Sequence, residues 1–407
     1  MSSRAGYAAM LAAALVSAPA TADEPEAARA RLEALERQYQ ALRQRTDREL
    51  ARLAREIDAL RSAPEGAAHT TPWTLSGDFR LRYEHTTSTP DGAPSRDRGV
   101  LRARLGADYT VADSLTLGGR IVTGDPDDPN SADITLGDFT DDLQVSLDRA
   151  YVHWGDDSAF LVAGKFANPL TATDLVWDGD VNPQGVAGRY RLYRGDRLAA
   201  HVTGLYAVVD EQPAGADSDM TGGQLGFDLV IASDWAAGFD VGYYDYAIGS
   251  LANADAGDIR DNRLNAAGTD YLSDFDLLDV VAEVSFTPPE AWPVTVTADY
   301  VKNLGAADGE DSGYAAEIAI GRLESPGDFR FGYGYAVAET DAVFAAYSHD
   351  NLTYATNYRL HALSLGYVPS PHVRLDLTGY RYRRHEALPG TDDAPVTRVR
   401  LNWSLVF

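Results

Sequence analysis

The sequence contains no cysteine, which excludes disulfides, thiolate metal sites and cysteine nucleophiles. It also lacks a basic excess, because its formal net charge is -26 over 407 residues. Non-specific nucleic-acid binding depends on a positively charged surface, so no nucleic-acid partner is expected. The eight histidines show no metal-ligand spacing and the acidic stretches show no EF-hand spacing. We therefore expect no metal and no cofactor.

Long apolar runs are missing as well, and a membrane helix needs about 20 such residues. The closest candidate, residues 8–16, follows Arg4 and precedes Ala20-Thr21-Ala22, an A-x-A cleavage pattern. These features predict a signal peptide over residues 1–22 and a mature chain that begins near Asp23. Export alone would also suit a soluble periplasmic protein, so the strand pattern has to decide the final compartment.

Glycine is absent from residues 24–62, where Ala, Leu, Arg, Glu and Gln recur. Apolar residues at spacings of three and four predict a helix of coiled-coil type over residues 23–62. A single amphipathic helix packed on the periplasmic mouth of a barrel is the alternative to self-association. Residues 63–71 contain Pro64 and Gly66 and are predicted to be a linker. The apolar stripe consists of Leu32, Leu35, Tyr39, Leu42, Leu50, Leu53, Ile57 and Leu60.

From Pro72 to Phe407 the hydropathic period changes from 3.6 to 2. In the first segment Leu75, Leu81 and Tyr83 alternate with Arg80 and Arg82, so one face of the strand is apolar and the other is charged. Sixteen segments of this kind lie near residues 73–84, 99–110, 114–123, 145–154, 159–166, 186–193, 197–208, 221–231, 234–246, 276–286, 293–302, 313–322, 327–338, 356–367, 372–382 and 398–407.

The connections between these segments alternate between short turns, such as residues 112–114 and 155–158, and long acidic loops. Short turns on one rim and long loops on the other are typical of an up-and-down membrane barrel. A soluble sandwich has no reason to alternate its connections in this way. Residues 72–407 are therefore predicted to be an all-β domain, a closed antiparallel transmembrane β-barrel of about sixteen strands.

Several short motifs occur in order along the predicted barrel: Leu147-Asp-Arg-Ala-Tyr151, Gly164-Lys-Phe-Ala-Asn-Pro169 and Leu175-Val-Trp-Asp-Gly-Asp180. They resemble the "Putative porin" family of Gram-negative outer membranes. The last residues, with Trp403, Leu405 and Phe407, resemble the aromatic signal that the barrel-assembly machinery reads. The resemblance implies a passive, trimeric diffusion channel for small polar solutes, surrounded by outer-membrane lipid and without a cofactor.

Basic residues gather on the predicted inner face of strands that adjoin where the barrel closes. Guanidinium groups stay charged and can bind carboxylates or phosphates, and such charges set ion preference in pores. The alternative is that the arginines pair with lumen acids such as Asp78, Asp108 and Asp148 and brace the barrel, and both roles can hold. We call the set the basic wall: Arg80, Arg82, Arg102, Arg104, Arg120, Lys165, Arg398 and Arg400.

The third long loop, residues 167–185, contains Asp174, Trp177, Asp178 and Asp180. General porins fold their third loop into the lumen, and in that case these acids would face the basic wall across a constriction. The alternative is an external loop in which Trp177 packs on a neighbour. Glycines on the inner parity, such as Gly118 and Gly242, favour an open bore.

Two short segments resemble enzyme motifs, but both are incomplete. Ala362-Leu-Ser-Leu-Gly366 lacks the first glycine of a nucleophile elbow and lies within a strand. Gly164-Lys165 lacks the glycine pattern of a phosphate-binding loop. No catalytic residue is predicted. A non-channel structural or adhesive barrel, and an export channel for an anionic polysaccharide, remain the alternatives to a diffusion channel.

Overall fold

The computed structural model describes Gln40 and residues 72–407, except residues 91, 129, 141, 255, 290, 388, 389, 391 and 392. The predicted signal peptide, coiled coil and linker lie outside the described residues, apart from Gln40. The chain divides into two units, Met1–Thr70 and Thr71–Phe407, and the second is the barrel. Among the described residues, no helix has both the length and the hydropathy of a membrane span.

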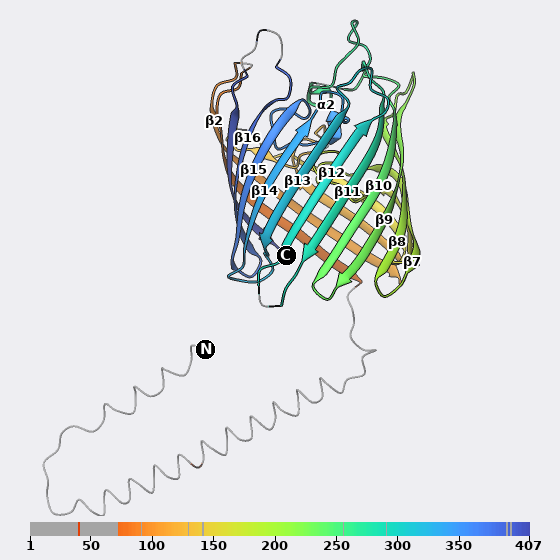
Figure 1. Cartoon of the computed structure of the whole chain (residues 1–407), viewed down its shortest axis with the longest axis vertical. Coiled ribbons are helices and arrows are strands. Elements are labelled where there is room, and N and C mark those ends of the chain that lie inside the picture. The colour runs from red at the N-terminus through yellow and green to blue at the C-terminus, as the bar shows by residue number, and fades with distance from the viewer. Residues whose placement is uncertain are drawn as a thin grey trace, which may run out of the picture. The chain divides into compact units, whose positions relative to one another are not determined.

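In the described part of the chain, the strands form one antiparallel sheet in which β17 pairs with β1, so the sheet closes on itself (Figure 1). Sixteen strands make the barrel wall, and β4 (Ile134–Thr135) is an additional two-residue strand that pairs with β2. The wall strands are β1 (Trp73–Thr86), β2 (Arg96–Ala112), β3 (Leu115–Thr123), β5 (Val145–Gly155), β6 (Ala159–Lys165), β7 (Gln184–Arg194), β8 (Leu198–Asp210), β9 (Ser218–Ala232), β10 (Trp235–Ala247), β11 (Phe275–Phe286), β12 (Val294–Asn303), β13 (Ser312–Gly321), β14 (Phe329–Ala338), β15 (Tyr358–Ser370), β16 (Val373–Arg384) and β17 (Val396–Val406).

The sequence prediction of a closed sixteen-stranded antiparallel barrel is confirmed, and each predicted segment corresponds to one wall strand. Closure places Arg80 opposite Ser404 and Glu84 opposite Arg400. The predicted basic wall on β17, β1, β2 and β3 is therefore continuous across the junction between the last and first strands. The short strand β4 was not predicted, because two residues carry no periodicity.

The two faces of the wall differ as the period of two requires. Leu75 is 65% exposed on the outer face, whereas Glu84 on the inner face is 2% exposed. The outer face presents many other large apolar side chains, including Leu117, Trp154 and Phe239. Such an exterior is suited to lipid, and closure of the sheet leaves no unpaired strand edge in it.

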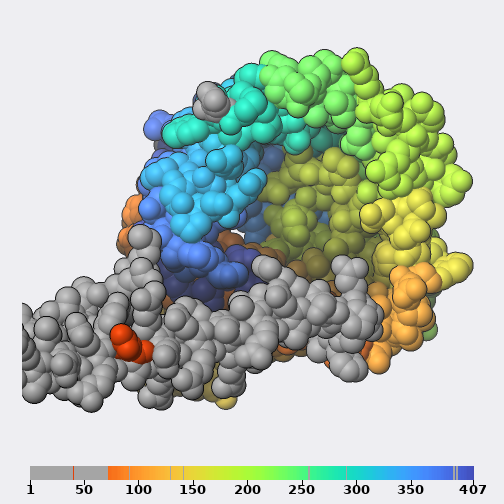
Figure 2. Space-filling model, turned by 90° about the horizontal axis from the view of Figure 1, so that it is seen from below, coloured from red at the N-terminus to blue at the C-terminus, as the bar shows by residue number. Residues whose placement is uncertain are grey.

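The strand connections place long loops at one end of the barrel and short turns, with the C-terminus, at the other (Figure 1). Three long loops matter here: L2 (residues 124–144, between β3 and β5), L3 (residues 166–183, between β6 and β7) and L7 (residues 339–357, between β14 and β15). Two short helices, α2 (Ala256–Ile259) and η2 (Ala345–Tyr347), lie in loops. Viewed from the short-turn end, the barrel is hollow (Figure 2).

The hydrophobic core lies inside the barrel and is built largely from these loops. Leu175, Val176 and Trp177 of L3 pack with Phe344 and Tyr354 of L7 against inward side chains of the wall. Burial of these apolar side chains stabilises L3 and L7 inside the barrel. The two loops therefore occupy part of the lumen. The apolar exterior and the apolar core are thus separated by a wall with a polar inner surface.

Candidate functional site

The predicted basic wall lies on the inner surface of β17, β1, β2, β3 and β6. Its arginine side chains are largely shielded from solvent, from 4% exposed for Arg400 to 19% for Arg104. Arg80 and Arg102 are direct partners in the β1–β2 register. Lys165 lines a neighbouring cavity of about 520 Å³. The inward placement follows from the alternation of side chains along each strand.

Each arginine of this wall has a carboxylate within salt-bridge distance. Asp78 accepts hydrogen bonds from Arg102 at 3.0 Å and from Arg104 at 2.5 Å. Asp148 pairs with Arg120. The bracing partners predicted at Asp78 and Asp148 are therefore present. The partner predicted at Asp108 is wrong, because this carboxylate instead accepts a 2.6 Å hydrogen bond from the Tyr151 hydroxyl.

The remaining partners come from Glu84 and from loop L2. Glu84 lies 2.7 Å from Arg98, 2.6 Å from Arg400 and 3.8 Å from Arg398. Asp133 of L2 reaches into the lumen, where it pairs with Arg80 and lies 2.6 Å from Arg82. Burial raises the pKa of Asp133, but the charges of Arg82 and Arg80 outweigh it and hold the pKa below its ordinary value. Sequence patterns placed Asp133 only in an acidic loop and could not find this contact.

A β-bulge adds an arginine that period-two analysis missed. The register between β3 and β5 shifts after Arg120, so that Asp148 and Arg149 both turn inward. Arg149 donates a 2.6 Å hydrogen bond to the side-chain amide oxygen of Asn182 in L3. Together with Arg374 on β16 it extends the basic wall around the short-turn end. The cavity there measures about 470 Å³ and its charged lining consists of Arg80, Arg102, Arg104, Arg120, Arg149, Arg374, Asp78 and Asp376.

Loop L3 crosses the inside of the barrel. The backbone of Thr171 exchanges two hydrogen bonds with the Gln224 side chain on β9, at 2.8 and 2.7 Å. The Thr173 hydroxyl donates to Asp299 on β12. The loop then returns to β2, where Asp180 contacts Arg104 at 2.7 Å and Arg102 at 3.4 Å. Hydrogen bonds therefore tie L3 to distant parts of the wall.

The sequence analysis expected the acids of L3 to face the basic wall across a gap. This expectation is wrong. Asp180 is bonded directly to two arginines of the wall. Asp174 and Asp178 lie in a separate group with His349 of L7. The reason is that L7 also enters the lumen, which the sequence did not indicate, and offers L3 a partner away from the wall.

Trp177 is a packing residue. Its ring stacks on Tyr347 with centroids 5.6 Å apart, and its edge meets Tyr244 of β10 at 5.9 Å. Only 3% of Trp177 is exposed. The indole therefore holds L3 against both L7 and the wall.

The opposite side of the lumen is acidic. Inward carboxylates on β10 to β13 include Asp240, Asp279, Glu283, Asp299 and Glu317, and the last three line a cavity of about 510 Å³. This acidic side and the basic wall lie on different arcs of the barrel, so a solute inside meets unlike charges on two sides. Oriented charges of this kind act on dipolar solutes at short range.

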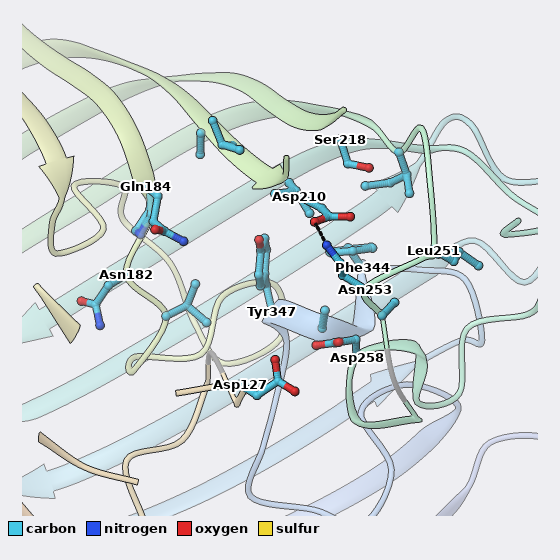
Figure 3. A pocket seen from close by; sticks show the side chains of 18 of the residues that line it. Asp127, Asn182, Gln184, Asp210, Ser218, Leu251, Asn253, Asp258, Phe344 and Tyr347 are labelled. Atoms are coloured by element: carbon cyan, nitrogen blue, oxygen red, sulfur yellow. Dashed lines mark hydrogen bonds between the residues drawn. The ribbon is translucent and has the colours of Figure 1, made fainter. Parts of the chain in front are cut away.

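The third cavity, of about 520 Å³, lies between L3, L7, β8 and the loop that follows β10 (Figure 3). Its lining mixes the aromatic ring of Tyr347 with polar groups such as Asn182, Gln184 and Asp210. In Figure 3 the Asn253 amide donates a 2.7 Å hydrogen bond to Asp210. Polar groups in the lining can form hydrogen bonds with small hydrophilic molecules.

Two glycines on the inner face of the barrel leave room for tyrosine side chains that lie over them. A Cβ at Gly118 would lie 2.2 Å from the Tyr151 ring, and one at Gly242 would lie 2.4 Å from the Tyr244 hydroxyl. The expectation that these glycines widen the bore is therefore wrong at both positions, because neighbouring aromatic side chains lie over them. At Gly238, by contrast, a Cβ would meet nothing within 4 Å.

Comparison with known proteins agrees with this architecture. The family described as "Putative porin" matches residues 86–254. The resemblance to porins is confirmed. No curated protein matches the chain. The match covers β2 to β10 in full, so it includes L2, L3 and four of the eight residues of the basic wall.

Solved porins share the fold of the barrel. OprB from Pseudomonas putida has a TM-score of 0.56 at 10% identity, over 83% of this chain and 94% of that one. The anion-selective porin from Comamonas acidovorans has a TM-score of 0.51 at 11% identity, over 82% and 99%. OmpF from Salmonella typhi, solved with daunomycin, has a TM-score of 0.50 at 10% identity, over 82% and 97%. At these identities the similarity shows the fold alone.

The family match and the porin fold support an outer-membrane channel for small solutes. They favour a channel over an enzyme. The charged lumen of this barrel, with its basic wall and acidic opposite side, is the surface that such solutes would meet.

Proposed function

We propose that this porin barrel passes small polar and ionic solutes by passive diffusion and prefers anions. The observation that carries the preference is the cavity at the short-turn end, whose lining holds six arginines and two aspartates. Arg149 is hydrogen-bonded to a neutral amide, and Arg374 to the backbone carbonyl of Leu323. Their charges are therefore less neutralised by neighbours than those of Arg102 or Arg104.

The net charge of the whole chain does not set this preference. Charges separated by more than about 8 Å are largely screened at physiological ionic strength, so an ion in the lumen responds mainly to nearby groups. Acidic residues in the loops contribute to the charge of -26, whereas the charged lining of the short-turn cavity has more arginines than aspartates. Anion preference then arises where the passage is lined by arginine.

The remaining parts of the proposal concern assembly. The predicted signal peptide exports the chain, and the apolar exterior is embedded in outer-membrane lipid. Trp403 and Phe407 are 40% and 56% exposed at the end of β17, where the barrel-assembly machinery could reach them. A homotrimer is part of the proposal because the predicted coiled coil over residues 23–62 would suit self-association.

One observation favours a second candidate, a structural barrel without a conducting pore. The core formed by L3 and L7 fills part of the lumen. The same loops argue against export of an anionic polysaccharide, which needs a wide bore free of an inward third loop. The cavities of about 470 to 520 Å³ suit small solutes instead.

Reconstitution in a planar bilayer distinguishes these candidates. A diffusion channel gives stepwise increases in conductance that grow with salt concentration. The detergent-folded protein must first show the heat-dependent gel mobility of an intact barrel. An absence of conductance then cannot be explained by misfolding. Intact barrels that never raise conductance would leave the structural barrel as the function.

A further inference from the structure

Two loops inside the lumen bring together donors that suit a metal ion. One ligand atom each from Asp174 and Asp178 of L3 and from His349 of L7 lies within 4.8 Å of the other two. A cation that binds nitrogen and oxygen at roughly 2.0–2.2 Å can be reached by atoms at such separations after small side-chain adjustments. The three residues come from loops far apart in the sequence, which explains why spacing in the sequence gave no indication of them.

Hydrogen bonds already orient the donor groups. The backbone N–H groups of Asp180 and Asp350 donate to Asp178 at 2.9 and 3.5 Å. The Asn351 side chain donates to Asp174 at 3.3 Å. Partners that hold the ligands in place in this way are typical of metal sites, where they raise affinity.

A second observation points to a missing ligand. The Tyr358 side chain is 0% exposed and its hydroxyl has no hydrogen-bond partner. Its ring meets the His349 ring edge-on at 6.0 Å, and it lines the same cavity as Asp174 and His349. A buried hydroxyl without a partner is costly, and water or a hydroxyl bound to a cation is a suitable partner.

We infer that Asp174, Asp178 and His349 form a site for one divalent transition-metal cation that fastens L3 to L7. Imidazole is a poor ligand for Ca²⁺ or Mg²⁺ and a good one for Zn²⁺, and carboxylates complete a set of the kind that Zn²⁺ accepts. The ion enters from the lumen through the cavity that Asp174 lines. Arg400 does not prevent binding, because Glu84 accepts a 2.6 Å hydrogen bond from its guanidinium.

Zinc uptake by the full-length, untagged, detergent-folded protein tests the inference. Equilibrium dialysis against Zn²⁺ followed by metal analysis should give one tightly held ion per chain, removable by EDTA. Asp178→Asn and His349→Gln should each weaken its binding at least tenfold. Asp308→Asn is the matched control, since this acid lies in an external loop and is paired with Arg263. It should retain wild-type uptake.

Two results would overturn the inference of a transition-metal site. Equal uptake by the wild type and by folded Asp178→Asn and His349→Gln would overturn the site. If Asp178→Asn does not fold, Asp174→Asn replaces it, because that side chain is exposed and its loss leaves the packing intact. Displacement of Zn²⁺ by equimolar Ca²⁺ would overturn the transition-metal assignment. Metal uptake needs no conductance, so this inference and the proposed channel can fail independently.

Discussion

The Asp180 carboxylate of L3 accepts a 2.7 Å hydrogen bond from the Arg104 guanidinium on β2. The same carboxylate contacts Arg102. The contact has two effects, since it ties an inner loop to the wall and it neutralises part of the basic wall. Removal of the carboxylate therefore changes both the charge of the lumen and the freedom of the loop.

Asp180→Asn should increase anion preference, because two arginines lose a negative neighbour. We also expect larger fluctuations of the open current, since L3 loses an ionic attachment. Single-channel recording with a salt gradient measures both. Asp308→Asn removes an equal charge outside the lumen and should change neither. A similar shift in both variants would show that the position of the charge does not matter.

Asp133→Asn should destabilise the barrel at neutral pH and not at strongly acidic pH. The folded-state pKa of Asp133 lies below its ordinary value. Its contribution is therefore present above the unfolded value, near 3.9, and is lost as the pH falls through the folded value. Breaking a buried ion pair costs about 3–5 kcal/mol.

Urea unfolding of wild type and Asp133→Asn in detergent, at pH 7 and at pH 2, checks this expectation. The difference in the free energy of unfolding should be large at pH 7 and small at pH 2. A difference of the same size at both pH values would mean that Asp133 acts through packing and not through its charge.

Gly118→Ala should destabilise the barrel by about 1–3 kcal/mol, the usual cost of overpacking. The added methyl group would lie 2.2 Å from the Tyr151 ring and would push its hydroxyl away from Asp108. Gly238→Ala is the matched control, because its Cβ meets nothing within 4 Å. Chemical denaturation compares the two. The same Cβ would lie 2.4 Å from the Asp108 carboxylate. Gly118→Ala should therefore cost little in a background that carries both Tyr151→Ala and Asp108→Ala, and a full penalty in that background would contradict the steric explanation.

Local patterns in the sequence were sufficient for the wall of this barrel. Period-two alternation depends only on neighbouring residues, so the strands and the inward placement of residues such as Arg80 and Arg102 could be predicted. The bulge at Asp148 and Arg149 could not, because a one-residue register shift depends on pairing with β3. The same is true of contacts made after loops enter the lumen, such as Asp133 with Arg82 and His349 with Asp178.

The reversal potential under a salt gradient tests the central claim most directly, in the wild type and in the double variant Arg149→Gln with Arg374→Gln. Both arginines line the short-turn cavity, and Arg383→Gln, on an exposed side chain paired with Asp393, is the control. The wild type and the control should be anion-selective, and the double variant should move toward zero or cation preference. A cation-selective wild type, or a double variant with an unchanged reversal potential, would contradict the assignment of anion preference to the arginine-lined short-turn cavity.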